Sequence, residues 1–308
     1  MPASARFLAA WVLGLAALAG THRVQAADDP HVLVLGRISD DPKAHYEQLK
    51  PLLDYVVPRM ANVGIREGRV LMARDVQQMA SYLRRGRVDW VTETAGTAIL
   101  LQQRSKARAL LVTERDGVSY YNTVFFARRD GAVATLDGML GHSIAFQNPA
   151  STSAYIQPAA ELVSRGMPLD ILMSPMERPD AESVGYLFAR SELNISTWVH
   201  KRLVDVGVMS NLDWNNPQRV PAGYKRDLKI IHESRPYPRA LEIVRGDLDD
   251  KVEVRLREVL LAAANDPDAR EALLLFFKTT RFLPVDAKSQ LALDTMREGV
   301  IRVHTEVE

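Results

Sequence analysis

Three short hydroxyl-bearing side chains, Ser151, Thr152 and Ser153, follow an apolar run and an Asn-Pro turn. The residues after them have helical spacing, so the three side chains open a predicted helix. The first main-chain N–H groups of a helix have no acceptor inside it, and the positive end of the helix dipole lies behind them. With the hydroxyls as further donors, this loop could fix a tetrahedral oxyanion without lysine or arginine. The alternative is simple N-capping, for which one Ser or Thr is sufficient.

Catalytic and metal-binding patterns are weak in this sequence. A nucleophilic Ser151 of the hydrolase type would sit in a G-x-S-x-G elbow, which the sequence lacks. The seven histidines are scattered and form no HExxH or paired i, i+4 set. We therefore predict a binding protein and not an enzyme, with no metal ion and no cofactor.

The elements that must position this loop alternate between strands and helices. In the first part of the chain, strands are predicted at 31–36, 69–73, 88–91 and 109–113, with helices around 46–57, 76–83 and 95–104. This alternation predicts a parallel sheet covered by helices. A second unit begins at the aromatic strand 120–128 and continues with a strand at 143–146, a helix through 160–163, an apolar run at 203–209 and a strand at 228–231.

The remaining segments connect or cover these units. Residues 210–224, rich in Asn and Pro, are predicted to form a long surface loop. The segment 233–239 contains Pro236 and Pro238, so it is expected to be extended and not helical. Helices are predicted at 251–264, at 268–277 and around 291–300.

Composition limits the class of partner. The chain has 308 residues and 47% hydrophobic content, enough for a globular protein with a real core. Its 39 Lys and Arg residues against 38 Asp and Glu leave a formal charge of +1, so no nucleic-acid partner and no anionic membrane surface are predicted. Without cysteine there is neither a disulfide nor a lipid-carrying thiol, and the core alone must stabilise the fold.

Residues 1–26 have the pattern of a cleaved export signal. Arg6 precedes an apolar run at 7–19, and Val24-Gln25-Ala26 forms a small-residue cleavage site. The alternative is a membrane anchor, but the run is shorter than the roughly 20 residues that span a bilayer. We expect a periplasmic protein with no stable membrane insertion after cleavage.

The loop and its surroundings resemble a known family. NPASTSAYIQPAAEL is similar to the signature of periplasmic phosphonate-, phosphate- and phosphite-binding proteins of ABC transporters, whose loop runs roughly Asp-Pro-x-Ser-Thr-Ser-Gly-Tyr with a proline a few residues later. The matching positions are Asn148-Pro149, Ser151 to Ser153, Tyr155 and Pro158. Ala154 stands where the family usually has glycine. The similarity extends more weakly from about residue 31 to residue 284.

The resemblance implies the fold of a type 2 periplasmic binding protein. This is an α/β fold with two lobes, each a mixed sheet flanked by helices, joined by two crossover segments around a ligand cleft. The segments 120–130 and 230–239 stand where the crossings are expected. On this basis lobe 1 comprises residues 27–122 and 232–308, and lobe 2 comprises residues 123–231.

The resemblance also implies the ligand-binding residues. Ser151, Thr152 and Ser153 would clamp the oxyanion, and Tyr121 matches a tyrosine whose hydroxyl contacts the anion in relatives; its alternative role is cross-strand packing. Tyr155 is a further candidate, although packing of the helix is the better interpretation.

Four other residues are expected at the cleft of the implied fold. Glu93 and Thr94 follow a strand of the first lobe. A carboxylate beside a bound dianion is repelled, so either the anion keeps a proton or the ligand carries an amine, unless Glu93 only caps the next helix. Asn211 and Asp213 could select the organic part of a ligand. Arg235 and Arg239 stand where relatives place acidic residues, which weakens an aminoalkylphosphonate assignment.

The implied function is capture of a small anionic ligand of the phosphonate, phosphite or phosphate class. The predicted partner is the permease of an ABC transporter. The alternative partner is a membrane sensor kinase, because the same fold serves both tasks.

Overall fold

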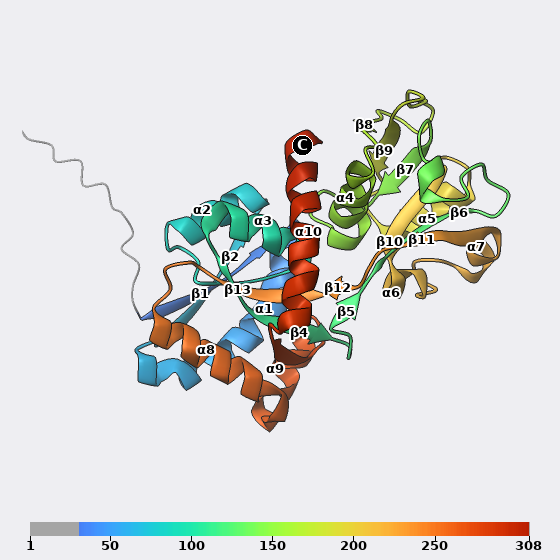
Figure 1. The fold of residues 1–308 in the computed structure, drawn as a ribbon. Coiled ribbons are helices and arrows are strands. Elements are labelled where there is room, and N and C mark those ends of the chain that lie inside the picture. The colour runs from blue at the N-terminus through green and yellow to red at the C-terminus, as the bar shows by residue number, and fades with distance from the viewer. Residues whose placement is uncertain (1–30, 308) are drawn as a thin grey trace, which may run out of the picture.

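The computed structural model describes residues 31–307, so the predicted export signal lies outside the described residues. Two six-stranded sheets form two bodies (Figure 1). The first sheet has the order β14-β4-β13-β3-β1-β2. Its strands are β1 (Val32–Ile38), β2 (Glu67–Ala73), β3 (Trp90–Glu93), β4 (Arg108–Arg115), β13 (Ala240–Val244) and β14 (Thr279–Pro284).

The second sheet has the order β11-β6-β10-β7-β9-β8. Its strands are β6 (Thr123–Arg128), β7 (Ser143–Phe146), β8 (Leu169–Ile171), β9 (Val184–Phe188), β10 (Val206–Ser210) and β11 (Leu228–Glu233). Both sheets contain parallel and antiparallel pairs. The two-lobed α/β fold with mixed sheets is therefore confirmed, and we keep the predicted lobe boundaries as names for the two halves.

Helices cover both faces of each sheet. The first lobe carries α1 (Pro42–Val56), α2 (Val76–Arg84), α3 (Ala95–Ser105), α8 (Asp250–Ala262), α9 (Arg270–Leu275) and α10 (Ala287–Glu306). The second carries α4 (Gln157–Ser164), α5 (Glu192–His200), α6 (Asn211–Trp214) and α7 (Ala222–Asp227). In the first lobe, alternation along the strands sends Leu33, Leu35 and Trp90 to the face of α1, α8 and α9. Val91 and Leu241 pack on the opposite face with α2 and α3.

The two crossings pair with each other. Strand β5 (Tyr120–Tyr121) runs antiparallel to β12 (Tyr237–Pro238), with Tyr121 opposite Tyr237. These short strands lie between the two bodies in Figure 1. Pro238 is tolerated because this two-stranded ribbon has no further neighbour.

The last helix, α10, contacts both lobes. It packs against α3 of the first lobe and α4 of the second, and it lies between the two bodies in Figure 1. The contact with α4 is close, because a Cβ added to Gly299 would lie 2.9 Å from Cβ of Ala160.

The structure differs from the sequence-based prediction in two places. The first-lobe sheet is not purely parallel, because β13, from the far end of the chain, inserts antiparallel between β3 and β4. Residues 210–224 are not one irregular loop, because α6 and the start of α7 lie there. Trp214 at the end of α6 is buried against Phe126. This apolar contact fixes the segment on the lobe, although its Asn and Pro content predicted an exposed loop.

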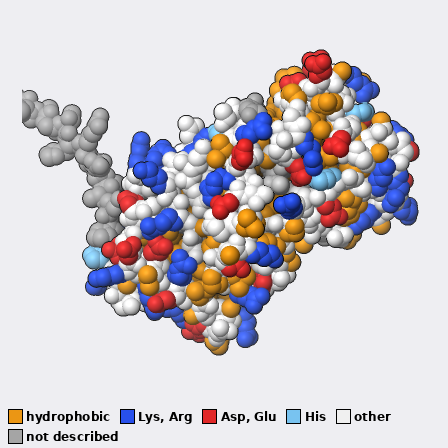
Figure 2. Space-filling model, in the orientation of Figure 1, with side chains coloured by type: hydrophobic (Ala, Val, Ile, Leu, Met, Phe, Trp, Pro, Cys, Tyr) orange, Lys and Arg blue, Asp and Glu red, His pale blue; other side chains and the backbone are white. Residues whose placement is uncertain are grey.

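The surface has no single dominant charge on the face drawn in Figure 2, where basic and acidic side chains are interspersed. No helix among the described residues is both long and apolar enough to cross a membrane.

Candidate functional site

A cavity of about 720 Å³ lies between the lobes. The first lobe contributes the carboxyl ends of β1, β2 and β3, which share one sheet edge because these strands are parallel. Such an edge is where open α/β sheets bind ligands. The second lobe contributes residues 147–153, and Tyr121 comes from the crossing strand β5.

The Ser151–Ser153 loop forms the wall of the cleft on the second lobe. It leads into a π-helical turn, η3 (Thr152–Ile156), which runs directly into α4. Ala154 departs from helical geometry there, with φ −116°. Single π-helical turns occur frequently at functional sites. Because Thr152 and Ser153 open the turn, no carbonyl within it can accept from their main-chain N–H groups.

The Ser151 hydroxyl acts as the N-cap, accepting from the Ala154 N–H at 3.3 Å. The Ser151 hydroxyl is therefore used for capping. The loop can also bind an anion only if its other donors contact the ligand.

The Thr152 hydroxyl joins the two lobes. It donates to Oγ1 of Thr94 at 2.8 Å and accepts from the main-chain N–H of Gly96 at 3.0 Å. Its side chain is buried, and a Cβ on Gly96 would lie 3.0 Å from this same hydroxyl. Thr94 and Thr152, both predicted as ligand-binding residues, thus contact each other across the cleft.

Tyr121 lies at the base of the cleft. Its ring packs edge-on against Tyr237 with a centroid distance of 4.8 Å, and its hydroxyl is hydrogen-bonded to the side chain of Ser153. Burial raises the pKa of Tyr121 to about 12. The hydroxyl therefore remains protonated at neutral pH and can act as a donor.

The wall on the first lobe contains arginines, which the sequence analysis did not predict. Arg37 from the end of β1 lines the cavity with His45, Arg74 and Arg104, and the acidic side chains of Asp40, Asp75 and Glu93 lie in the same lining. Burial, followed by the charge of Arg37, lowers the pKa of His45. The arginines carry no local motif, and only the topology of the sheet brings them to one edge.

Glu93 is buried in this wall, and its Oε1 accepts from the main-chain N–H of Ile38 at 2.9 Å. The positive charge of Arg115, at the end of β4, is electrostatically coupled to it. The sequence left two ways to relieve repulsion between Glu93 and a bound anion, a proton on the anion or an amine on the ligand. The structure supplies a third way to relieve this repulsion, because the buried guanidinium of Arg115 offsets the charge of Glu93 within the protein.

Three candidate residues do not line the cavity. Tyr155 is buried in an aromatic cluster with Phe146 and Phe188, at centroid distances of 5.1 and 5.0 Å. Asn211 accepts through Oδ1 from the main-chain N–H of Asn122 at 3.2 Å. Asp213 pairs with the hydroxyl of Ser210, the N-cap of α6. The structure therefore brings Glu93, Thr94, Tyr121 and Ser151–Ser153 together and leaves these three outside.

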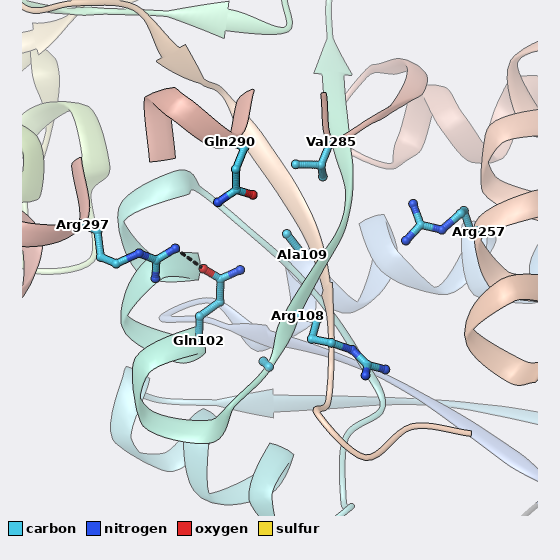
Figure 3. A pocket seen from close by; sticks show the side chains of 8 residues that line it. Gln102, Arg108, Ala109, Arg257, Val285, Gln290 and Arg297 are labelled. Carbon is cyan, nitrogen blue, oxygen red and sulfur yellow. Dashed lines mark hydrogen bonds between the residues drawn. The ribbon is translucent and has the colours of Figure 1, made fainter. Parts of the chain in front are cut away.

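A second cavity, of about 490 Å³, is lined by side chains from α3, β4, α8 and α10 (Figure 3). Its three arginines are already engaged. Arg108 pairs with Glu253, Arg257 donates to the carbonyl of Leu110, and Arg297 donates to Gln102. It contains no element of the loop signature, so we place the ligand site in the interlobe cleft. Among residues 31–307, no group of three or more His, Asp or Glu side chains could hold a metal ion.

Two lobes with mixed sheets, two paired crossings and an interlobe cleft define the class of type 2 periplasmic binding proteins. Residues 36–291 match the family described as "ABC transporter, phosphonate, periplasmic substrate-binding protein". The chain belongs to this family of periplasmic substrate-binding proteins, which are not enzymes. Membership implies a small anionic ligand, an ABC transporter permease as partner and a periplasmic location.

Solved structures show the same architecture. XAC2383 from Xanthomonas citri, solved with a chloride ion, is 54% identical, covers 90% of this chain and 100% of its own, and superposes with a TM-score of 0.85. The same protein bound to ATP gives 53% identity, the same coverage and a TM-score of 0.85. PhnD1 from Prochlorococcus marinus, in complex with methylphosphonate, covers 91% of this chain and 100% of its own at 15% identity and a TM-score of 0.63, which shows the fold alone.

Proposed function

We propose that this protein captures a small phosphorus oxyanion, of the phosphonate, phosphite or phosphate class, between its lobes and presents it to an ABC transporter permease. The observation that carries the proposal is the cavity that the Ser151–Ser153 loop of the second lobe lines together with Arg37 of the first. Neutral donors on one side and guanidinium groups on the other suit an anion with several acceptor oxygens.

The ligands of the similar X. citri protein support an anion. Chloride and ATP share only their negative charge, and ATP adds phosphoryl groups on an organic body. A nucleotide therefore belongs in any ligand screen of this chain, beside the simple oxyanions.

The proposed mechanism is capture by lobe closure. The anion first binds the Ser151–Ser153 loop, and the first lobe then closes over it. The bond between Thr152 and Thr94 forms only when the lobes meet, so closure and ligand enclosure are coupled. Exclusion of water strengthens each hydrogen bond in the closed cleft.

A thermal-shift screen tests the ligand class. The ligands are phosphate, phosphite, methylphosphonate, 2-aminoethylphosphonate, sulfate and ATP. A ligand at 100 times its Kd stabilises the folded state by about 2.7 kcal/mol, which raises the Tm of a chain of this size by roughly 5 °C. A flat response to every phosphorus oxyanion contradicts the proposal.

A matched pair of variants tests the loop. Ser151 caps η3 and Ser191 caps α5 in the same way, accepting from the N–H three residues later at 3.3 and 3.2 Å. Ser151→Ala and Ser191→Ala should each lower the free energy of unfolding by about 1 kcal/mol. With Ser153→Ala added, the Ser151 variant should also lose ligand binding, while Ser191→Ala should bind normally. If the double variant at Ser151 and Ser153 bound the ligand as tightly as Ser191→Ala, these serines would have only a structural, capping role.

A further inference from the structure

Arg37, which lines the interlobe cavity, lies beside the buried Arg115, and each of the two side chains has an unpaired donor. Arg37 ends β1 and Arg115 ends β4. Both reach Thr92 on β3, Arg37 donating to its carbonyl at 3.1 Å and Arg115 to its hydroxyl at 3.3 Å. Both guanidinium groups also lie over the ring of Phe277, at 4.4 and 4.5 Å from its centroid. The Nε atoms of both arginines are buried, with no acceptor in the described part of the chain.

Without a bound anion, placing these two arginines side by side costs free energy. Like charges repel, and a buried donor without an acceptor costs roughly 1–3 kcal/mol. Burial, followed by the charge of Arg37, lowers the pKa of Arg115 to about 9, so Arg115 remains cationic at neutral pH. A third arginine, Arg239, donates to the Arg115 carbonyl at 2.7 Å and adds to the positive charge.

The carboxylates nearby do not complete the pair. Glu242 is fully buried and already accepts from Trp90, Thr92 and Thr113, at 2.6, 2.9 and 2.6 Å. Burial raises its pKa, so its negative charge is disfavoured. Glu93 accepts from the N–H of Ile38, and its charge, like that of Glu242, offsets part of the positive charge around Arg115 without an ion pair to either arginine.

Phe277 is held beside the guanidinium groups at a conformational cost. Phe277 and the next residue, Lys278, have φ values of +53° and +55°, the left-handed region that bulky side chains rarely adopt. Strain of this kind persists where the surroundings require it and is concentrated at functional sites. Here it places an aromatic ring against both guanidinium groups, which orders them without neutralising them.

We propose that Arg37, with the charge of the buried Arg115 beside it, binds a second acidic group of the ligand, so that the preferred ligands carry two or more phosphoryl groups. This inference rests on the proposed function, because the first phosphoryl group occupies the Ser151–Ser153 loop. The fork of a guanidinium matches two oxygens of a phosphate. The cavity, at about 720 Å³, lies within the range that encloses much larger ligands than a single phosphonate.

Calorimetric titration with methylphosphonate and with pyrophosphate tests this inference. The natural sequence should bind pyrophosphate at least tenfold more tightly than methylphosphonate. Arg37→Gln should remove this preference, because it should weaken the binding of pyrophosphate at least tenfold more than the binding of methylphosphonate. Arg37→Lys, which keeps the charge but loses the planar fork, should retain only part of the preference.

Arg69→Gln is the matched control. Arg69 lies on β2 of the same lobe but outside the cavity, and its side chain is 59% exposed and pairs with Glu67. Its removal takes away the same charge, so the preference for pyrophosphate should be unchanged within about twofold. Circular dichroism melting of each variant verifies that it is folded.

Four outcomes separate the two proposals. If the natural sequence binds both anions equally, or if Arg69→Gln lowers the preference as much as Arg37→Gln, Arg37 is not part of a second ligand subsite and the proposed function stands. If Arg37→Gln leaves the preference intact, the inference is likewise wrong. If neither anion binds, the proposed function fails and the inference with it.

Discussion

The two walls of the interlobe cleft hold their polar groups by different means. On the second lobe, the Ser151–Ser153 loop presents main-chain N–H groups and hydroxyls at a helical turn, fixed by local bonds such as the cap of Ser151. On the first lobe, Arg37 and Arg115 come from strands that are far apart in the sequence and meet at Thr92 and at the ring of Phe277. The buried Glu242 accepts from Trp90, Thr92 and Thr113.

The two walls thus illustrate two ways to build a recognition site. One is encoded by a single short segment of the sequence, and the other depends on the order of the strands in the whole sheet. A loop held by its own caps can tolerate changes elsewhere in the lobe, because its donors belong to the backbone. A guanidinium pair depends on long-range packing, since the loss of one support beneath it leaves several buried groups unpaired. Under the proposed function, the second lobe would bind the oxyanion common to all ligands, and the first lobe would contact the features that distinguish one ligand from another.

The largest effect should come from the buried network of the first lobe. Glu242→Ala would leave Trp90, Thr92 and Thr113 without their shared acceptor and would remove a negative charge near Arg115. Breaking a buried charged network typically costs 3 kcal/mol or more. We expect urea unfolding to show a loss of about 3 kcal/mol.

Glu242→Gln is the control for this change, because it retains one oxygen acceptor. Its amide would face the Trp90 N–H, so an intermediate loss is expected. Identical stability of the two variants and the natural sequence would show that the first-lobe wall does not depend on this network.

A smaller effect is expected where the walls meet. Gly96→Val would place side-chain atoms within about 3 Å of the Thr152 hydroxyl and of Ile156, so the lobes could not close fully. Ligand affinity should fall about tenfold, equivalent to about 1.4 kcal/mol. Small-angle scattering of the liganded variant should show a larger radius of gyration than that of the natural sequence.

Gly223→Val, on α7 and with no atom nearer than 4.0 Å to the added Cβ, is the control for the steric change. Its affinity should be unchanged. Full affinity in the Gly96 variant would indicate that the contact between Thr152 and Thr94 is not needed for capture.

The smallest effect should distinguish the two candidate tyrosines. Tyr121→Phe keeps the packing on Tyr237 but removes a buried hydroxyl at the cleft base. Loss of one neutral hydrogen bond to the ligand costs about 1 kcal/mol, or roughly fivefold in affinity. Tyr155→Phe keeps the aromatic cluster outside the cavity and should leave affinity unchanged. If Tyr155→Phe lowered the affinity and Tyr121→Phe did not, Tyr155 and not Tyr121 would contact the ligand.

Much of the fold could be predicted because its signals are local. The spacing of apolar residues located most helices and strands, and the proline-rich segment at 233–239 was expected to be extended, as β12 is. The insertion of β13 between β3 and β4 could not be predicted in this way. Its pairing depends on partners about 130 to 150 residues away, and no local pattern carries that information.

The site was predictable to the same degree. Ser151, Thr152 and Ser153 were found because a run of hydroxyls at a helix start is visible in the sequence, and the structure places them in the cleft wall. Arg37 and Arg115 were missed, since a single arginine at a strand end is not distinctive until the sheet order is known. Asn211 and Asp213 were expected at the cleft because they follow β10, but the turn of α6 directs them into local bonds instead.

The last helix has a consequence for how the hinge can move. Helix α10 follows β14 of the first lobe, yet Gly299 lies closely against Ala160 of the second. Any rotation between the lobes must then slide or separate these two helices as well as bend the paired crossings. Side-chain size at Gly299, which is not among the residues that line the interlobe cavity, can therefore adjust the angle to which the lobes open.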